Sequence, residues 1–121
     1  MRKYKWISKY CLSMTGVVED FKEEWQATRY MVGGKMFALV GGDKTGRPIV
    51  NVKLDPADNE FLRGMYEDIV PGYYMNKVHW SSAYLDGKIP REVLLDMLQR
   101  ARGVVFRALP KKAREALEAG E

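Results

Sequence analysis

The central segment of this 121-residue sequence constrains the fold more than any other part. Two strand-forming runs, residues 29–32 and 35–40, are joined by Gly33-Gly34, and glycine reaches the positive φ angles that tight hairpin turns require. A second turn, rich in glycine and containing aspartate, covers residues 41–46 and leads into a third strand over residues 48–54. The segment therefore predicts a three-stranded antiparallel meander.

Helical patterns flank this meander. Residues 2–12 place their apolar side chains on one face, and Asp55-Pro56 begins a second helix, with Asp55 as the cap and Pro56 in the first turn. Residues 90–109 carry the strongest helical signal, and residues 111–119 predict a short final helix. The signal is a continuous apolar stripe at helical spacing, formed by Val93, Leu94, Met97, Leu98, Ala101, Val104, Val105 and Ala108.

The remaining segments complete a single α+β domain over residues 1–121. We interpret residues 17–28 as irregular or a short strand, residues 70–72 as a turn and residues 73–85 as one or two strands. Successive strands with short connections imply an antiparallel sheet of about five strands covered by helices.

Charge and cysteine content limit the possible environments. The net charge is +4, and residues 70–114 hold nine basic against three acidic side chains, which indicates an acidic partner. A single cysteine, Cys11, excludes an intrachain disulfide and fits a reducing compartment. The apolar runs are far shorter than the ~20 residues that span a bilayer. We therefore expect a cytoplasmic protein, most simply a monomer.

Five short strings occur in the order typical of one known family. The most specific is Pro-Gly-Tyr-Tyr-Met-Asn-Lys-Val-His-Trp at residues 71–80. The others are Tyr10-Cys11-Leu12, Gly34-Lys35-Met36-Phe37-Ala38, Val52-Lys53-Leu54-Asp55-Pro56 and Leu109-Pro110-Lys111-Lys112. Together they cover essentially the whole chain, which resembles the MmcQ/YjbR family.

The resemblance implies a CyaY-like, or frataxin-like, sandwich that has been described as a double wing and proposed to bind DNA. The chain departs from the family at Tyr74, where histidine is usual, and at Thr15-Gly16, where Pro-Gly is common. Arg102-Gly103 lies near the position where the family often has Ser-Tyr. The loss of a histidine at residue 74 weakens any metal-binding or acid–base role for the motif.

Basic and aromatic residues interleave in the hairpins, as expected of a nucleic-acid interface. Lysines neutralise phosphates, asparagine can read an adenine edge, and aromatic rings stack on exposed bases. The candidate residues are Lys35, Lys53, Tyr73, Tyr74, Asn76, Lys77, His79, Lys111, Lys112 and Arg114. Strand alternation predicts that Val78 and Trp80 face the core, whereas Lys77 and His79 lie on an exposed edge and Asn76 fixes a turn.

Two other functions compete with DNA binding. A protein-interaction or chaperone-like adaptor would use an exposed sheet face populated by Tyr30, Tyr73, Tyr74 and Trp25. A metal-binding, frataxin-like role would use the carboxylates of Glu19, Asp20, Glu23 and Glu24, although Lys22 among them favours a solvated acidic surface. We predict no cofactor and no enzymatic activity, because a lone His79 and a lone Cys11 on an apolar helix face make a poor catalytic pair.

Overall fold

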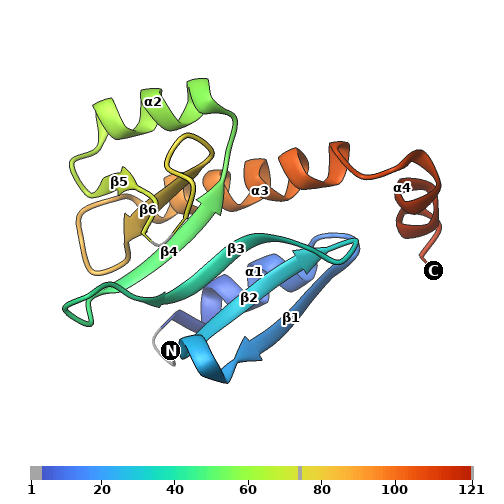
Figure 1. Ribbon diagram of the computed structural model, residues 1–121, viewed down its shortest axis with the longest axis horizontal. Coiled ribbons are helices and arrows are strands. Elements are labelled where there is room, and N and C mark those ends of the chain that lie inside the picture. Colours follow the sequence, from blue (N-terminus) through green and yellow to red (C-terminus); the bar gives the residue numbers. More distant parts are fainter. Residues whose placement is uncertain (1–3, 74, 121) are drawn as a thin grey trace.

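The computed structural model of the protein describes residues 4–73 and 75–120 and contains one six-stranded sheet with helices packed against it (Figure 1). The helices are α1 (Lys5–Ser13), the short 3-10 helix η2 (Glu23–Trp25), α2 (Pro56–Met65), α3 (Arg91–Arg107) and α4 (Lys111–Glu118). The strands are β1 (Val17–Lys22), β2 (Ala27–Val32), β3 (Lys35–Gly42), β4 (Pro48–Lys53), β5 (Ile69–Pro71) and β6 (Trp80–Tyr84). Their order in the sheet is β1-β2-β3-β4-β6-β5, and every neighbouring pair is antiparallel. The predicted α+β class with an antiparallel sheet is confirmed.

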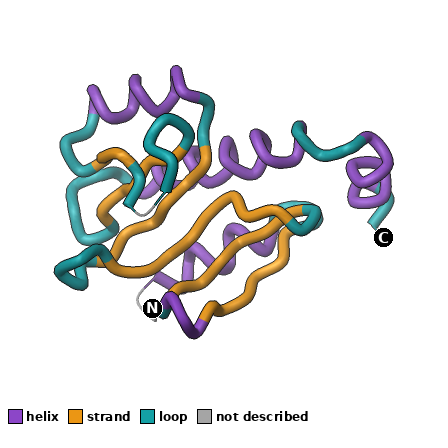
Figure 2. Tube along the Cα trace, viewed as in Figure 1, coloured by secondary structure: helices purple, strands orange, loops and turns teal. Residues whose placement is uncertain are grey.

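One face of the sheet is covered by helices, and the core lies between them. α1 packs on β1, and α3 crosses β2, β3 and β4, so that both helices pass behind the sheet in the view of Figure 2. Along β4, Val50 and Val52 face this core, whereas Asn51 points to the opposite face, as strand alternation requires. α2 adds Leu62 to the same core. We call the other side of the sheet the open face.

The hairpin at Gly33-Gly34 forms as predicted. Both glycines have positive φ, +58° and +77°, which only glycine adopts without strain. A bulge between Tyr30 and Met31 then shifts the register of β2 against β3. Tyr30 is buried at 3% exposure, so the prediction that it populates an exposed sheet face is wrong.

Several predicted boundaries differ from the structure. Residues 17–22 form a full edge strand, which makes the meander four-stranded, and residues 69–71 form β5 where a turn was expected. Residues 73–79, expected to belong to a strand, form with Gly72 a loop of turns in the described part. Asp55 precedes α2 but makes no side-chain capping hydrogen bond, and its carboxylate oxygen lies 3.9 Å from an Arg107 guanidinium nitrogen.

The helices of the described residues are too short or too polar to cross a membrane.

Candidate nucleic-acid interface

Strand topology gathers the predicted residues of the hairpins at one end of the sheet. In an antiparallel sheet, the turn from β2 to β3, the end of β4 and the link from β5 to β6 all lie at the same end. Lys35 opens β3, Lys53 closes β4, and Lys77 lies in the 72–79 loop. We call this the basic end. Residues far apart in the sequence thereby come to one side of the molecule.

The opposite end of the sheet is acidic. It carries the links β1–β2, β3–β4, α2–β5 and β6–α3. Including the strand residues that border the described links, the acidic end holds six carboxylates and four cations, whereas the basic end holds three lysines and one aspartate. The acidic end's carboxylates are Glu23, Glu24, Asp43, Glu67, Asp68 and Asp86, and its cations are Lys22, Lys44, Arg47 and Lys88.

The 72–79 loop is held together by its own side chains. The Asn76 carboxamide oxygen accepts hydrogen bonds from the backbone N–H groups of Val78 (2.9 Å) and His79 (3.3 Å), which confirms that Asn76 fixes a turn. The Lys77 ammonium donates to the Gly72 carbonyl at 2.9 Å. Asn76 therefore has a structural role, and its amide oxygen is already occupied.

Two residues of α2, which the sequence analysis missed, anchor this loop from the side. Arg63 donates to the carbonyl oxygens of Lys77 and Trp80 at 2.6 and 2.5 Å. The buried Asn59 donates to the Val78 carbonyl at 2.9 Å. The spacing of Asn59 and Arg63, one helical turn apart, was the available signal for a polar face on α2.

The side chains of the loop are exposed to different degrees. His79 and Lys77 are exposed, as predicted, and Trp80 is half-buried. Val78 is 58% exposed, so its predicted core position is wrong, because the segment turns instead of continuing as a strand. Tyr74 lies outside the described residues.

The predicted C-terminal cations belong to α4, which begins next to the β2–β3 turn. Gly33 lies so close to Leu109 that a Cβ added there would fall 2.5 Å from a Leu109 methyl carbon. α4 then extends to one extremity of the molecule (Figure 1). Lys111 and Lys112 are exposed near the basic end, whereas Arg114 is half-buried and its Nε has no hydrogen-bond partner among the described residues.

A pocket of about 500 Å³ lies on the open face. Small residues of β2 and β3 leave space there, and Trp25 and Met75 line it from two connections at different ends of the sheet. Trp25 is 53% exposed. The lining residues are Trp25, Ala27, Leu39, Gly41, Gly42, Asn51 and Met75.

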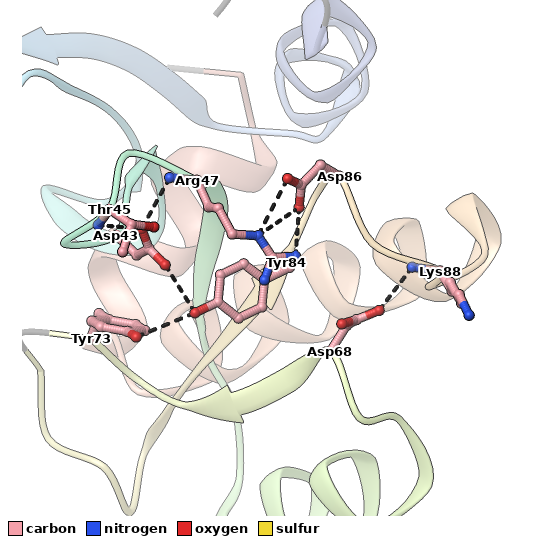
Figure 3. Close-up of polar contacts among 8 residues, drawn as sticks. All are labelled: Asp43, Thr45, Arg47, Asp68, Tyr73, Tyr84, Asp86 and Lys88. Carbon is pink, nitrogen blue, oxygen red and sulfur yellow. Dashed lines mark hydrogen bonds and ion pairs between the residues drawn. The ribbon is translucent and has the colours of Figure 1, made fainter.

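Tyr73 connects the 72–79 loop to this open face. Its backbone N–H donates to the Ser82 hydroxyl at 2.9 Å, and Ser82 in turn donates to the buried Asn51 carboxamide. Its hydroxyl lies 3.2 Å from that of Tyr84, as Figure 3 shows. Tyr73 is thus half-buried in a hydrogen-bonded position, rather than freely available for stacking on a base.

The Tyr84 hydroxyl also contacts the turn between β3 and β4 (Figure 3). Asp43 accepts bonds from this hydroxyl at 3.0 Å and from the Thr45 hydroxyl at 2.7 Å, and its pKa is lowered to about 2 mainly by the Thr45 bond. Arg47 stacks on the Tyr84 ring and pairs with Asp86, which lowers the pKa of that carboxyl. The network fixes the β3–β4 turn to β6.

The acidic cluster of the sequence is divided between the faces of β1. Glu19 and Asp20 are adjacent strand residues and so point to opposite sides. Asp20 forms a two-pronged pair with Arg29, whose guanidinium lowers the pKa of the Asp20 carboxyl. Among residues 4–73 and 75–120, no three His, Cys, Asp or Glu side chains gather as metal ligands.

Cys11 is fully buried in α1, whereas His79 is exposed in the loop. Burial raises the pKa of the Cys11 thiol to about 12, so the thiol stays protonated at neutral pH. The buried cysteine therefore lacks the thiolate that nucleophilic catalysis requires.

A protein family and two curated proteins are similar to this chain in sequence. The YjbR family model matches residues 12–103. The uncharacterized protein YjbR of Escherichia coli K12 is 31% identical over 109 residues, covering 90% of this chain and 92% of that protein. The uncharacterized protein YbdF of Escherichia coli O157:H7 is 33% identical over 91 residues, covering 75% and 74%.

Solved structures share the fold. The crystal structure of Deinococcus radiodurans protein DR2400, a DUF419 domain, superposes with a TM-score of 0.83 at 29% identity, over 93% of this chain and 85% of that one. A Pseudomonas syringae protein shares the fold with a TM-score of 0.68 at 19% identity, over 80% of this chain and 93% of that one.

Proposed function

This chain is a member of the YjbR family, and we propose that it binds DNA, with little dependence on base sequence, through the basic end of its sheet. The observation that supports the proposal is the unequal charge of the two ends. Lys35, Lys53 and Lys77 lie at the basic end with a single aspartate, and the exposed Lys111 and Lys112 lie nearby. Lysines placed along a phosphate backbone displace its counterions, which provides affinity without reading sequence.

The distribution of charge would also orient the protein. The acidic end holds six carboxylates against four cations, so its net negative charge repels a polyanion and the basic end approaches it first. The 72–79 loop is braced by Arg63 and Asn59, which lowers the entropic cost of presenting Lys77. Lys77 uses one of its three ammonium protons on the Gly72 carbonyl, and two remain for phosphate.

We propose a binding role without catalysis. The protonated, buried Cys11 and the exposed His79 on a separate element do not form the nucleophile–base pair that covalent catalysis needs. The polar network around Asp43 ties a turn to β6, and a structural role accounts for its contacts.

Titration of a labelled 20-base-pair duplex with the protein tests the proposal. We expect binding at 50 mM salt that weakens by one or more orders of magnitude at 200 mM salt, as for an interface of several phosphate contacts. Lys77→Ala should lower the affinity severalfold at 50 mM salt because one phosphate contact is lost. Lys44→Ala, which removes an exposed lysine from the acidic end, is the matched control and should bind as the wild type does.

Two results would count against DNA binding at the basic end. The first is a flat titration of the wild type at 50 mM salt. The second is an equal loss of affinity in Lys77→Ala and Lys44→Ala, since the position of the lysine would then be irrelevant.

A further inference from the structure

We infer that the open-face pocket takes an unpaired nucleobase, so that the protein prefers single-stranded to duplex DNA. This inference rests on the proposed function and names the form of DNA that the site accepts. It adds an uncharged half to the interface: the basic end holds the backbone, and the pocket holds a base. The two halves are joined by the 72–79 loop, which carries both Lys77 and the pocket residue Met75.

Trp25 supplies the surface on which a base can stack. Its side chain is 53% exposed and lines the pocket, and the Lys22 and Arg29 cations lie 5.7 and 5.9 Å from its ring centre. An indole face is sequence-tolerant because every base has a flat π surface. An exposed tryptophan that borders a pocket is thus suited to a planar, aromatic occupant.

Charge around Trp25 favours a neutral occupant. Arg29 is paired with Asp20 at 2.8 Å, and Lys22 lies 3.7 Å from Glu24. The cations near the indole are therefore paired with carboxylates, and Trp25 itself lies at the acidic end in the same short helix as Glu23 and Glu24, so a phosphate would be repelled there. The uncharged base fits this region, whereas the phosphates fit the basic end, where lysines outnumber carboxylates.

The floor and a further wall of the pocket also suit a flat group. Ala27, Gly41 and Gly42 contribute at most a methyl group each, so the strands beneath the pocket present a shallow surface. Met75 adds a polarizable thioether, which makes favourable contacts with aromatic rings. The buried Asn51 amide is held by Ser82 and by the Leu39 carbonyl, and it forms a fixed polar group in the lining.

A base reaches this pocket only if it leaves its stack. In a duplex, extrusion of a base costs the stacking and pairing energy, whereas a single strand offers its bases at little cost. The lysines would bind the phosphates of either form, but the pocket would add affinity for the single strand alone.

Anisotropy titrations of labelled oligothymidylate and of a duplex of equal length test the inference. We expect Trp25→Ala to weaken oligothymidylate binding by between about fivefold and a hundredfold, as for loss of one stacked base. Duplex binding should change less than twofold. Met75→Ala should show the same selectivity to a smaller degree. Phe61→Ala is the matched control, because Phe61 is an aromatic residue of similar exposure (62% against 53% for Trp25) on α2 and outside the pocket lining.

The failures of the inference and of the proposed function are distinguishable. Equal effects of Trp25→Ala on both DNA forms, or no effect on either, would overturn the pocket assignment. The proposed function would survive that result if Lys77→Ala still weakened duplex binding. An absence of binding of either form by the wild type would overturn the proposed function, and the inference with it.

Discussion

Individual side chains of residues 71–80, the most specific string of the sequence, have structural roles that the sequence alone does not reveal. Asn76 closes a turn, Lys77 contacts the Gly72 carbonyl, and the backbone of the motif is held by Arg63 and Asn59 from α2. Such contacts depend on where α2 lies after folding. These hydrogen bonds explain why the 72–79 segment, whose side chains alternate as in a strand, is a braced loop instead.

The hydrogen bonds of the single residue Asp43 predict a pH-dependent contribution to stability. Its folded-state pKa of about 2 lies below the ordinary value of 3.8, so its hydrogen bonds stabilise the fold above pH 4 and are lost as the pH falls toward 2. Asp43→Asn should therefore unfold more easily than the wild type at pH 7, and the difference should shrink between pH 4 and pH 2. Urea unfolding across this pH range measures it; a difference that stays constant would contradict the assignment.

At the scale of elements, local signals succeed where one segment determines its own conformation. The paired glycines between two apolar runs predicted the β2–β3 hairpin, and the apolar stripe of residues 90–109 predicted α3. The segment that forms the edge strand β1 was left open between an irregular stretch and a short strand, because its exposed side chains do not alternate clearly. β5 was missed because Pro71 ends a strand of only three residues.

The β2–β3 turn provides a prediction for an element and its neighbour. Gly33→Ala should destabilise the fold by more than Gly34→Ala, although both glycines have positive φ. Only at Gly33 does the new methyl group collide with Leu109, whereas Gly34 has open space. We expect Gly34→Ala to cost about 1 kcal/mol, the penalty of an L-residue in the left-handed conformation, and Gly33→Ala to cost at least about twice that.

Chemical unfolding of the two variants measures the difference. Adding Leu109→Ala to Gly33→Ala should recover part of the loss, because it removes the colliding side chain. Equal losses in the two single variants would show that backbone conformation alone sets the cost.

At the scale of the whole molecule, the charge pattern results from topology. Lys35, Lys53 and Lys77 lie far apart in the sequence, and they meet at one end because successive strands alternate in direction. Sequence reasoning predicted these lysines as candidate contacts and also predicted the fold class. It could not place the carboxylates at the opposite end, or form a pocket from Trp25 and Met75, since both depend on the order of strands and the path of the 72–79 loop.

The salt dependence of duplex binding tests the central claim most directly. The slope of log affinity against log salt concentration counts the phosphates that a protein neutralises. Replacing Lys35, Lys53 and Lys77 with alanine should make the slope shallower by about one per lysine. Replacing Lys22, Lys44 and Lys88, the lysines of the acidic end, should leave the slope unchanged. Equal slopes for the two triple variants would contradict the account.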